Sequence, residues 1–123
     1  MTSHTVLIVE DDKWLAEQYF RVLSAKDYKV TTTSHALAAI QLIDDIQPDA
    51  IILDVLLTGS TAFTLLHELQ SYGDTGVIPI IICTNLADEL TLENLSSYGV
   101  KQIIDKTKMM PADLVLALQN VLP

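Results

Sequence analysis

The sequence predicts an α/β fold in which five helices cover both faces of a five-stranded parallel sheet, giving a three-layer sandwich. Short apolar runs rich in β-branched residues alternate with longer segments of helical periodicity along the whole chain. Three of these runs, at 6–9, 51–53 and 80–82, are apolar at every position, as strands covered on both faces should be. Strict alternation also favours parallel strands, because parallel neighbours need a crossover connection that a helix usually supplies.

The expected strands are placed by these runs and by the residues that border them. Residues 29–32 are rich in β-branched side chains, and an X-Pro step at Pro79 opens the fourth run. The second and fifth runs are more polar or shorter than the others, which suits the edges of a sheet. Five strands of this kind favour the flavodoxin-like order 2-1-3-4-5. The predicted strands are Thr5–Val9, Lys29–Thr32, Ala50–Asp54, Ile78–Cys83 and Gln102–Ile104.

The expected helices are placed by capping and terminating residues. Asp12 and Ser34 are of the residue types that cap helix N-termini, and we expect each to begin a helix. Pro48 ends the second helix, Gly99 follows the fourth as a C-cap, and Pro111 lies in the first turn of the last. The predicted helices occupy about 12–26, 34–46, 61–71, 87–97 and 111–121.

Length and composition indicate one globular domain, expected to span residues 1–123. The chain is 50% hydrophobic and 19% charged, which is enough apolar material for a core. Its uninterrupted apolar runs reach about five residues, far fewer than the ~20 that a membrane-spanning helix needs. Residues 1–4 lack the basic segment of a signal peptide, and the single Cys83 cannot form an internal disulfide. We therefore expect a cytoplasmic protein that does not associate with membranes.

The charge distribution argues against direct binding of nucleic acid. The net charge is −9, and no lysine or arginine occurs between Lys29 and Lys101. Affinity for nucleic acid comes largely from basic side chains on phosphates, so this chain should repel a polyanion. An acidic surface of this kind can simply keep a protein soluble. It can also attract a basic protein partner or a divalent cation, and both alternatives stay open at this point.

Polar side chains follow four of the predicted strands. Glu10 and Asp11 come after the first strand, Asp54 after the third, Thr84 after the fourth and Lys106 after the fifth. In an open α/β sheet the functional site lies at the carboxyl ends of the strands, so these side chains should converge. Taken singly, each is equally typical of a turn, a helix cap or a solvent-facing strand end.

This combination of side chains suits phosphoryl transfer to a carboxylate. Clustered carboxylates with open positions beside them are the ligands that Mg²⁺ prefers, and an aspartate can act as a nucleophile toward phosphorus. An ammonium and a hydroxyl would then stabilise the charge on the transferred oxygens. The sequence contains no glycine-rich phosphate loop and no G-x-S-x-G motif, which makes a nucleotide-binding protein or a serine hydrolase a weak alternative. Cys83, inside an apolar run, is expected to be a core residue.

Four segments resemble the receiver domain of two-component response regulators, and the resemblance covers essentially the whole chain. Val6–Asp12 is similar to the family's first strand and acidic pair, and Pro48–Asp54 to its approach to the phosphoacceptor. Ile78–Thr84 is similar to its fourth strand with the switch hydroxyl, and Gly99–Lys106 has its spacing from glycine to lysine.

The resemblance implies a function and a role for each site residue. Asp54 would accept a phosphoryl group from a histidine kinase or phosphotransfer protein, in a Mg²⁺-dependent reaction that switches a protein-binding surface. Such a domain catalyses at most its own phosphorylation and dephosphorylation and is not otherwise an enzyme. The implied metal ligands are Glu10, Asp11, Asp54 and the backbone carbonyl of Leu56, and the implied catalytic residues are Asp54, Lys106 and Thr84.

The sequence departs from the family's usual pattern around the site. The affected positions are Thr58 and Ala62, where Pro and Gly are usual, Asn85 and Ile103 at the switch, and Thr107 in place of Pro. Gly59 is expected to relocate the turn before the third helix, and the Lys106–Thr107 bond should be trans. These departures motivate an alternative, a receiver-like interaction module that signals without phosphorylation.

The implied partners are a histidine kinase or phosphotransfer protein and a downstream protein or a fused output domain. A homodimer formed through the last strand and helix is a further possibility. Leu56 and Leu86, two residues beyond the acceptor and the switch hydroxyl, are apolar, so we expect slow self-dephosphorylation. Trp14 is expected to cover the first helix rather than to lie near the site.

Overall fold

The computed structural model of the 123-residue chain describes residues 3–57, 60–71 and 76–122. A five-stranded sheet has the order β2-β1-β3-β6-β7, with every neighbouring pair parallel, which confirms the predicted 2-1-3-4-5 arrangement. The sheet strands are β1 Thr5–Val9, β2 Lys29–Thr33, β3 Ala50–Leu53, β6 Ile80–Thr84 and β7 Val100–Asp105. The helices are α1 Lys13–Ser24, α2 Ala36–Ile46, α3 Ala62–Gln70, α4 Leu92–Leu95 and α5 Ala112–Val121.

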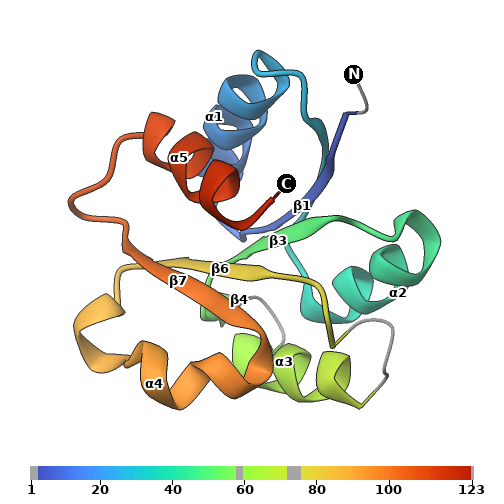
Figure 1. Cartoon of the computed structure of the whole chain (residues 1–123), viewed down its shortest axis with the longest axis vertical. Coiled ribbons are helices and arrows are strands. Elements are labelled where there is room, and N and C mark those ends of the chain that lie inside the picture. Colours follow the sequence, from blue (N-terminus) through green and yellow to red (C-terminus); the bar gives the residue numbers. More distant parts are fainter. Residues whose placement is uncertain (1–2, 58–59, 72–75, 123) are drawn as a thin grey trace.

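Helices cover both faces of the sheet, so the molecule has three layers (Figure 1). Helices α1 and α5 lie on one face, and α2, α3 and α4 lie on the other. Alternate side chains of the central strands point to opposite faces, as the two-residue period of a strand requires. Val6 and Ile8 pack with Tyr19 and Leu114 in one apolar cluster, whereas Leu7 and Val9 belong to the other. The sheet therefore separates two cores.

The helix expected at 87–97 is instead three short pieces. A 3₁₀ helix, η1 Ala87–Glu89, precedes α4, and a second, η2 Ser96–Tyr98, follows it. Leu90 is extended at ψ 149°, and the Thr91 hydroxyl accepts a hydrogen bond from the amide of Asn94 at 3.3 Å. A new helix begins after Thr91 because a threonine hydroxyl can bond to nearby backbone amides, which favours an N-cap over continuation of the preceding helix.

Two further expectations at helix ends have different outcomes. Ser34 is not the cap of α2: His35 is the N-cap, and its side chain makes no capping hydrogen bond. Strand β2 extends one residue further than predicted, to Thr33, and the amide of His35 donates to the Thr33 hydroxyl at 3.4 Å. Gly99 is the C-cap of η2 with φ 85°, as predicted, and an added Cβ would lie 3.3 Å from the Ile78 carbonyl oxygen.

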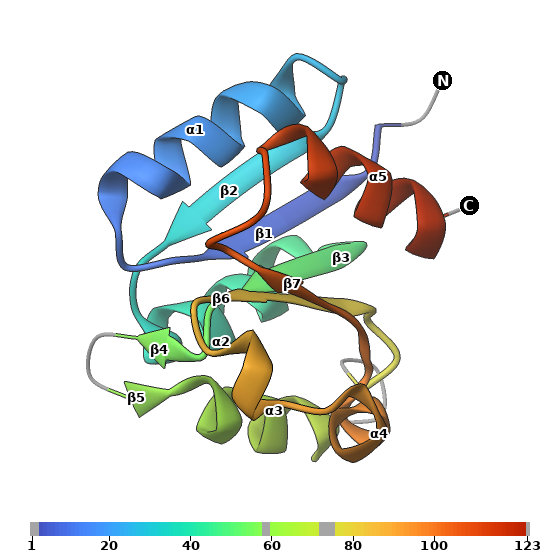
Figure 2. The ribbon, with the colours of Figure 1, turned by 90° about the vertical axis from the view of Figure 1, so that its left-hand side faces the viewer.

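The segment between β3 and α3 forms an antiparallel hairpin that was not predicted. Its strands are β4 Leu56–Leu57 and β5 Ser60–Thr61 (Figure 2). The expected turn residues Thr58 and Gly59 lie outside the described residues. Among the helices that are described, none is long and apolar enough to cross a membrane.

Candidate functional site

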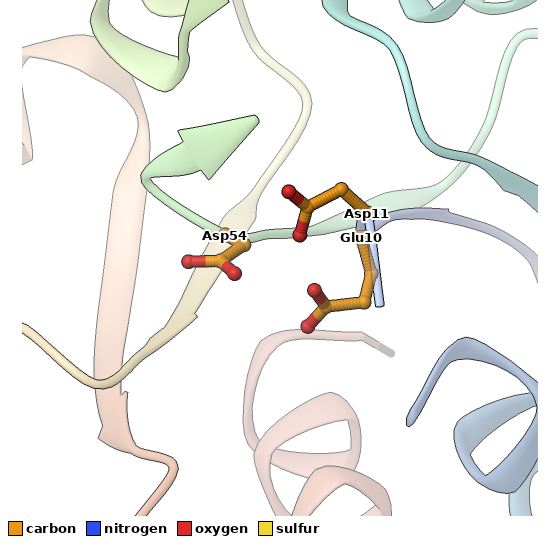
Figure 3. A group of neighbouring side chains, drawn as sticks. All are labelled: Glu10, Asp11 and Asp54. Atoms are coloured by element: carbon orange, nitrogen blue, oxygen red, sulfur yellow. The ribbon is translucent and has the colours of Figure 1, made fainter. Parts of the chain in front are cut away.

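Three carboxylates meet at the carboxyl ends of β1 and β3. Glu10 and Asp11 follow β1 directly, and Asp54 follows β3. One oxygen from each side chain can be chosen so that all three lie within 4.8 Å of one another, and Figure 3 shows the side chains side by side. The amide of Asp54 donates to the Val9 carbonyl at 3.0 Å, which fixes the two strand ends together. The predicted convergence of these residues is therefore present in the structure.

Lys106 lies between two of these carboxylates. Its Nζ atom is 2.5 Å from Oε1 of Glu10 and 2.6 Å from Oδ2 of Asp54. The lysine side chain is 8% exposed, so these ion pairs are shielded from solvent. The three clustered carboxylates outnumber the Lys106 ammonium that pairs with two of them, which leaves an excess of negative charge. Such an excess is what a divalent cation would neutralise.

Burial and pairing shift two pKa values at the site. Burial raises the pKa of Glu10 to about 7, although hydrogen bonding to Lys106 opposes the shift. Burial alone would lower the pKa of the Lys106 ammonium, but its bonds to Asp54 and Glu10 outweigh burial and raise it. Lys106 therefore stays charged, whereas Glu10 is poised to exchange a proton near neutrality. Perturbed pKa values in a polar cluster are typical of functional sites.

A backbone amide and Lys106 together orient the Glu10 carboxylate. The amide of Asp12 donates to Oε2 of Glu10 at 3.2 Å, so both oxygens of that carboxylate have partners. The side chain of Asp12 is occupied elsewhere, because its Oδ1 accepts from the amides of Trp14 and Leu15. Asp12 is thus the predicted cap of α1. Asp11 is exposed at the mouth of the site.

Thr84 ends β6, between β3 and β7 in the sheet. Its side chain is fully buried, its carbonyl accepts from the amide of Lys106 at 3.0 Å, and its Oγ1 accepts from the amide of Leu86 at 3.1 Å. A hydroxyl that accepts in this way still has its own proton to donate. Leu56 begins β4, two residues beyond Asp54. The roles of the Thr84 hydroxyl and the Leu56 carbonyl stay predictions.

Two neighbouring features were not foreseen. Trp14 is 66% exposed, and it lines a cavity of about 300 Å³ that Lys106 and Met109 also line, so it lies closer to the site than expected. Met109 and Tyr19, which both line this cavity, contact Cys83: its thiol donates to Met109 Sδ at 3.2 Å and lies 3.7 Å from the Tyr19 hydroxyl. Cys83 is buried, as predicted for a core residue, and burial raises its pKa to about 11. No sequence pattern marks this sulfur pair.

The family model of the response regulator receiver domain matches residues 6–119. The chain therefore belongs to the response regulator receiver domain family. It is 33% identical over 117 residues to the transcriptional regulatory protein BaeR of Escherichia coli O6:H1, and the match covers 95% of this chain. The chain spans 47% of the length of BaeR.

Two solved structures show the same fold. One is the BeF₃-activated N-terminal receiver domain of Klebsiella pneumoniae RstA, with 26% identity, a TM-score of 0.77, and coverage of 95% of this chain and 97% of that one. The other is the receiver domain of the sensor histidine kinase PA1611 from Pseudomonas aeruginosa PAO1, with a magnesium ion coordinated in its active site cleft. It shares 23% identity at a TM-score of 0.85, and the match covers 98% of both chains.

Proposed function

We propose that this receiver domain accepts a phosphoryl group on Asp54 from a histidine kinase or phosphotransfer protein. The observation that carries the proposal is the position of the Lys106 ammonium, which contacts both Glu10 and Asp54. An oxygen of the exposed Asp11 lies within 4.8 Å of oxygens of these two carboxylates. The carboxylates and the lysine together support phosphoryl transfer over a binding module that signals without phosphate.

A magnesium ion is the cofactor that fits this donor set. The clustered oxygens of Glu10, Asp11 and Asp54 are hard ligands, and Mg²⁺ binds one or two carboxylates together with phosphate oxygens and water. We propose the backbone carbonyl of Leu56 as a further ligand. Bound Mg²⁺ would offset negative charge on the transferred oxygens. The magnesium ion in the cleft of the PA1611 receiver domain supports the same assignment here.

The chain's own residues would then perform the transfer. An oxygen of the Asp54 carboxylate forms the new bond to phosphorus, while the bond from phosphorus to the donor histidine nitrogen breaks and the nitrogen keeps that electron pair. The Lys106 ammonium neutralises charge on the oxygens of the transferred phosphoryl group, and the Thr84 hydroxyl donates a hydrogen bond to one of these oxygens. The hydrogen bond from the Thr84 hydroxyl would draw Thr84 and the segment that follows it toward the acyl phosphate. The surface around η1 and α4 would change as a result.

The changed surface would be read by a downstream protein, a fused output domain or a second copy of the chain. Because BaeR is a transcriptional regulatory protein and this chain matches 47% of its length, control of transcription through a fused domain is one such output.

Acetyl phosphate, with and without Mg²⁺, tests the proposal on the purified chain. We expect the intact mass to rise by one phosphoryl group only with Mg²⁺, and the Asp54→Asn variant to show no gain. The Asp44→Asn variant is a matched control, since Asp44 is an exposed aspartate on α2. No gain in the wild type, or an undiminished gain in Asp54→Asn, would refute the assignment.

A further inference from the structure

The segment that follows β7 is closed into a turn by hydrogen bonds centred on Asp105. The carbonyl of Asp105 accepts from the amide of Lys108 at 3.1 Å, so Lys106 and Thr107 are the two central residues of a β-turn. The Oδ1 atom of Asp105 also accepts from the amide of Thr107 at 2.9 Å and from its hydroxyl at 2.6 Å. One carboxylate oxygen therefore binds both polar hydrogens that Thr107 offers.

The residue types explain why the turn forms here. Aspartate is favoured at the first position of a β-turn, because its side chain can bond to the backbone amide two residues further on. The hydrogen bonds from Thr107 lower the pKa of the Asp105 carboxyl, so the acceptor stays ionised. The Lys108 ammonium adds little, at 4.0 Å from Oδ2 on an exposed side chain. The Thr107 contacts are the principal ones.

The turn holds the backbone of Lys106, whose side chain enters the site. On one side, the amide of Lys106 is bonded to the Thr84 carbonyl, which continues the pairing of β6 with β7. On the other side, Asp105 and Thr107 fix the direction in which the chain leaves Lys106. A lysine side chain has many rotamers, so a fixed backbone direction limits the positions its ammonium can take. Here the ammonium reaches Glu10 and Asp54.

The far end of the same loop is held separately. The amide of Met110 donates to Oδ2 of Asp113 at 2.9 Å, just before α5 begins. This is also a bond between a carboxylate and a backbone amide, and it lies in the same connection between β7 and α5. It has no contact with Lys106 among the interactions described, so Asp113 provides a matched control for the loss of such a bond.

We propose that Asp105 is a positioning residue that, through its side-chain bonds to Thr107, holds the Lys106 ammonium between Glu10 and Asp54. The inference rests on the proposed function only in its consequence for phosphoryl transfer; the positioning itself is a property of the resting protein. Asp105 acts through Lys106 and does not touch the phosphoryl group.

The first test observes the ammonium directly in the metal-free chain. In ¹H–¹⁵N spectra of side-chain ammonium groups, the buried and doubly paired Lys106 should exchange its protons slowly and give a signal, assigned by its loss in Lys106→Met. We expect Asp105→Ala to broaden or abolish that signal and Asp105→Asn, which keeps an acceptor oxygen, to retain it. Asp113→Ala should leave it unchanged. An unchanged signal in Asp105→Ala would overturn the proposal, whether or not the chain can be phosphorylated.

The second test is a double-mutant cycle on the rate of phosphorylation by acetyl phosphate. Asp105→Ala should slow the reaction about fivefold to tenfold, which is the rate factor that corresponds to the net free energy of one hydrogen bond. Asp105→Asn should restore most of the rate. In the Lys106→Met background, Asp105→Ala should have no further effect. An equal loss in both backgrounds, or a loss that Asp113→Ala matches, would show a structural role and overturn the proposal. Lack of phosphorylation in the wild type would count against the proposed function, and the ammonium signal alone would then decide the role of Asp105.

Discussion

The Nζ atom of Lys106 lies 2.6 Å from Oδ2 of Asp54, and each of the two side chains is only 8% exposed. The same ammonium contacts Glu10, so one lysine offsets two buried carboxylates. Because a buried charge without a partner is costly, this contact links the stability of the domain to the charge state of its site.

Removal of Lys106 should destabilise the metal-free domain. We expect Lys106→Met to lower the free energy of unfolding by about 3 kcal/mol, because two buried carboxylates lose their counterion. Urea denaturation in the presence of a chelator measures the loss, and saturating Mg²⁺ should reduce it by supplying another cation. Lys108→Met is the control, since the Lys108 side chain is 79% exposed. Equal effects of the two substitutions would contradict this prediction.

The stability of the metal-free domain should fall as the pH rises from about 5 to about 7. Burial raises the pKa of Glu10 to about 7, from an ordinary value of 4.5. Between these values the folded chain binds the Glu10 proton more tightly than the unfolded chain, so stability is greatest at the acidic end of this window. Urea denaturation at several pH values checks the slope. Glu10→Gln should flatten it, whereas Glu17→Gln, at an exposed position on α1, should not.

The phosphorylated protein should lose its phosphoryl group slowly. Leu86, two residues beyond Thr84, is half-buried and apolar, and it cannot orient a water molecule for attack on phosphorus. We expect the phosphorylated form to have a lifetime of minutes or longer. The lifetime is measured as the decrease in the phosphorylated intact mass after acetyl phosphate is removed. Leu86→Gln should shorten the lifetime, while Leu92→Gln on α4 should leave it unchanged. Decay of the wild type within seconds would be the contrary result.

The contact between the Cys83 thiol and the Tyr19 hydroxyl should contribute to stability. Cys83→Ala removes that hydroxyl's partner at a buried position, and we expect a cost of about 1 to 3 kcal/mol in thermal or urea unfolding. Tyr19→Phe deletes the hydroxyl itself and should cost less. In the Tyr19→Phe background, Cys83→Ala should therefore be better tolerated. Additive losses would mean that the hydroxyl and the thiol do not interact.

The order of the sheet could be predicted from the sequence because it depends on strong and repeated signals. Runs such as Val6–Val9 and Ile80–Ile82 are apolar throughout, and alternation with helices leaves few parallel arrangements. The break in the helix expected at 87–97 could not be predicted from Gly99, which marks only the end of the segment. The break depends on Thr91, whose hydroxyl caps a new helix. The pairing of β4 with β5 could not be predicted because each strand contains two residues, too few for an alternation pattern.

The convergence of these polar side chains at one edge of the sheet could be predicted, but the bonds among them could not. Glu10, Asp11, Asp54 and Lys106 each follow a parallel strand, and the carboxyl ends of such strands lie at one edge of the sheet. The double contact of Lys106 depends on how its side chain leaves the turn, which strand patterns do not determine. The turn itself has a local sequence signal, which is an aspartate followed two residues later by a hydrogen-bond donor. That signal bears on function only because the residue between the two, Lys106, enters the site.

The separation of the two cores by the sheet has a consequence for how the domain tolerates change. Substitutions beneath α1 and α5 and substitutions beneath α2 and α3 meet different neighbours, so each set can vary without disturbing the other. The polar row at the strand ends belongs to neither compartment and borders both. Because Asp54 borders both cores, a charge added to it would act on both helical layers. This effect would not depend on which apolar side chains fill either core.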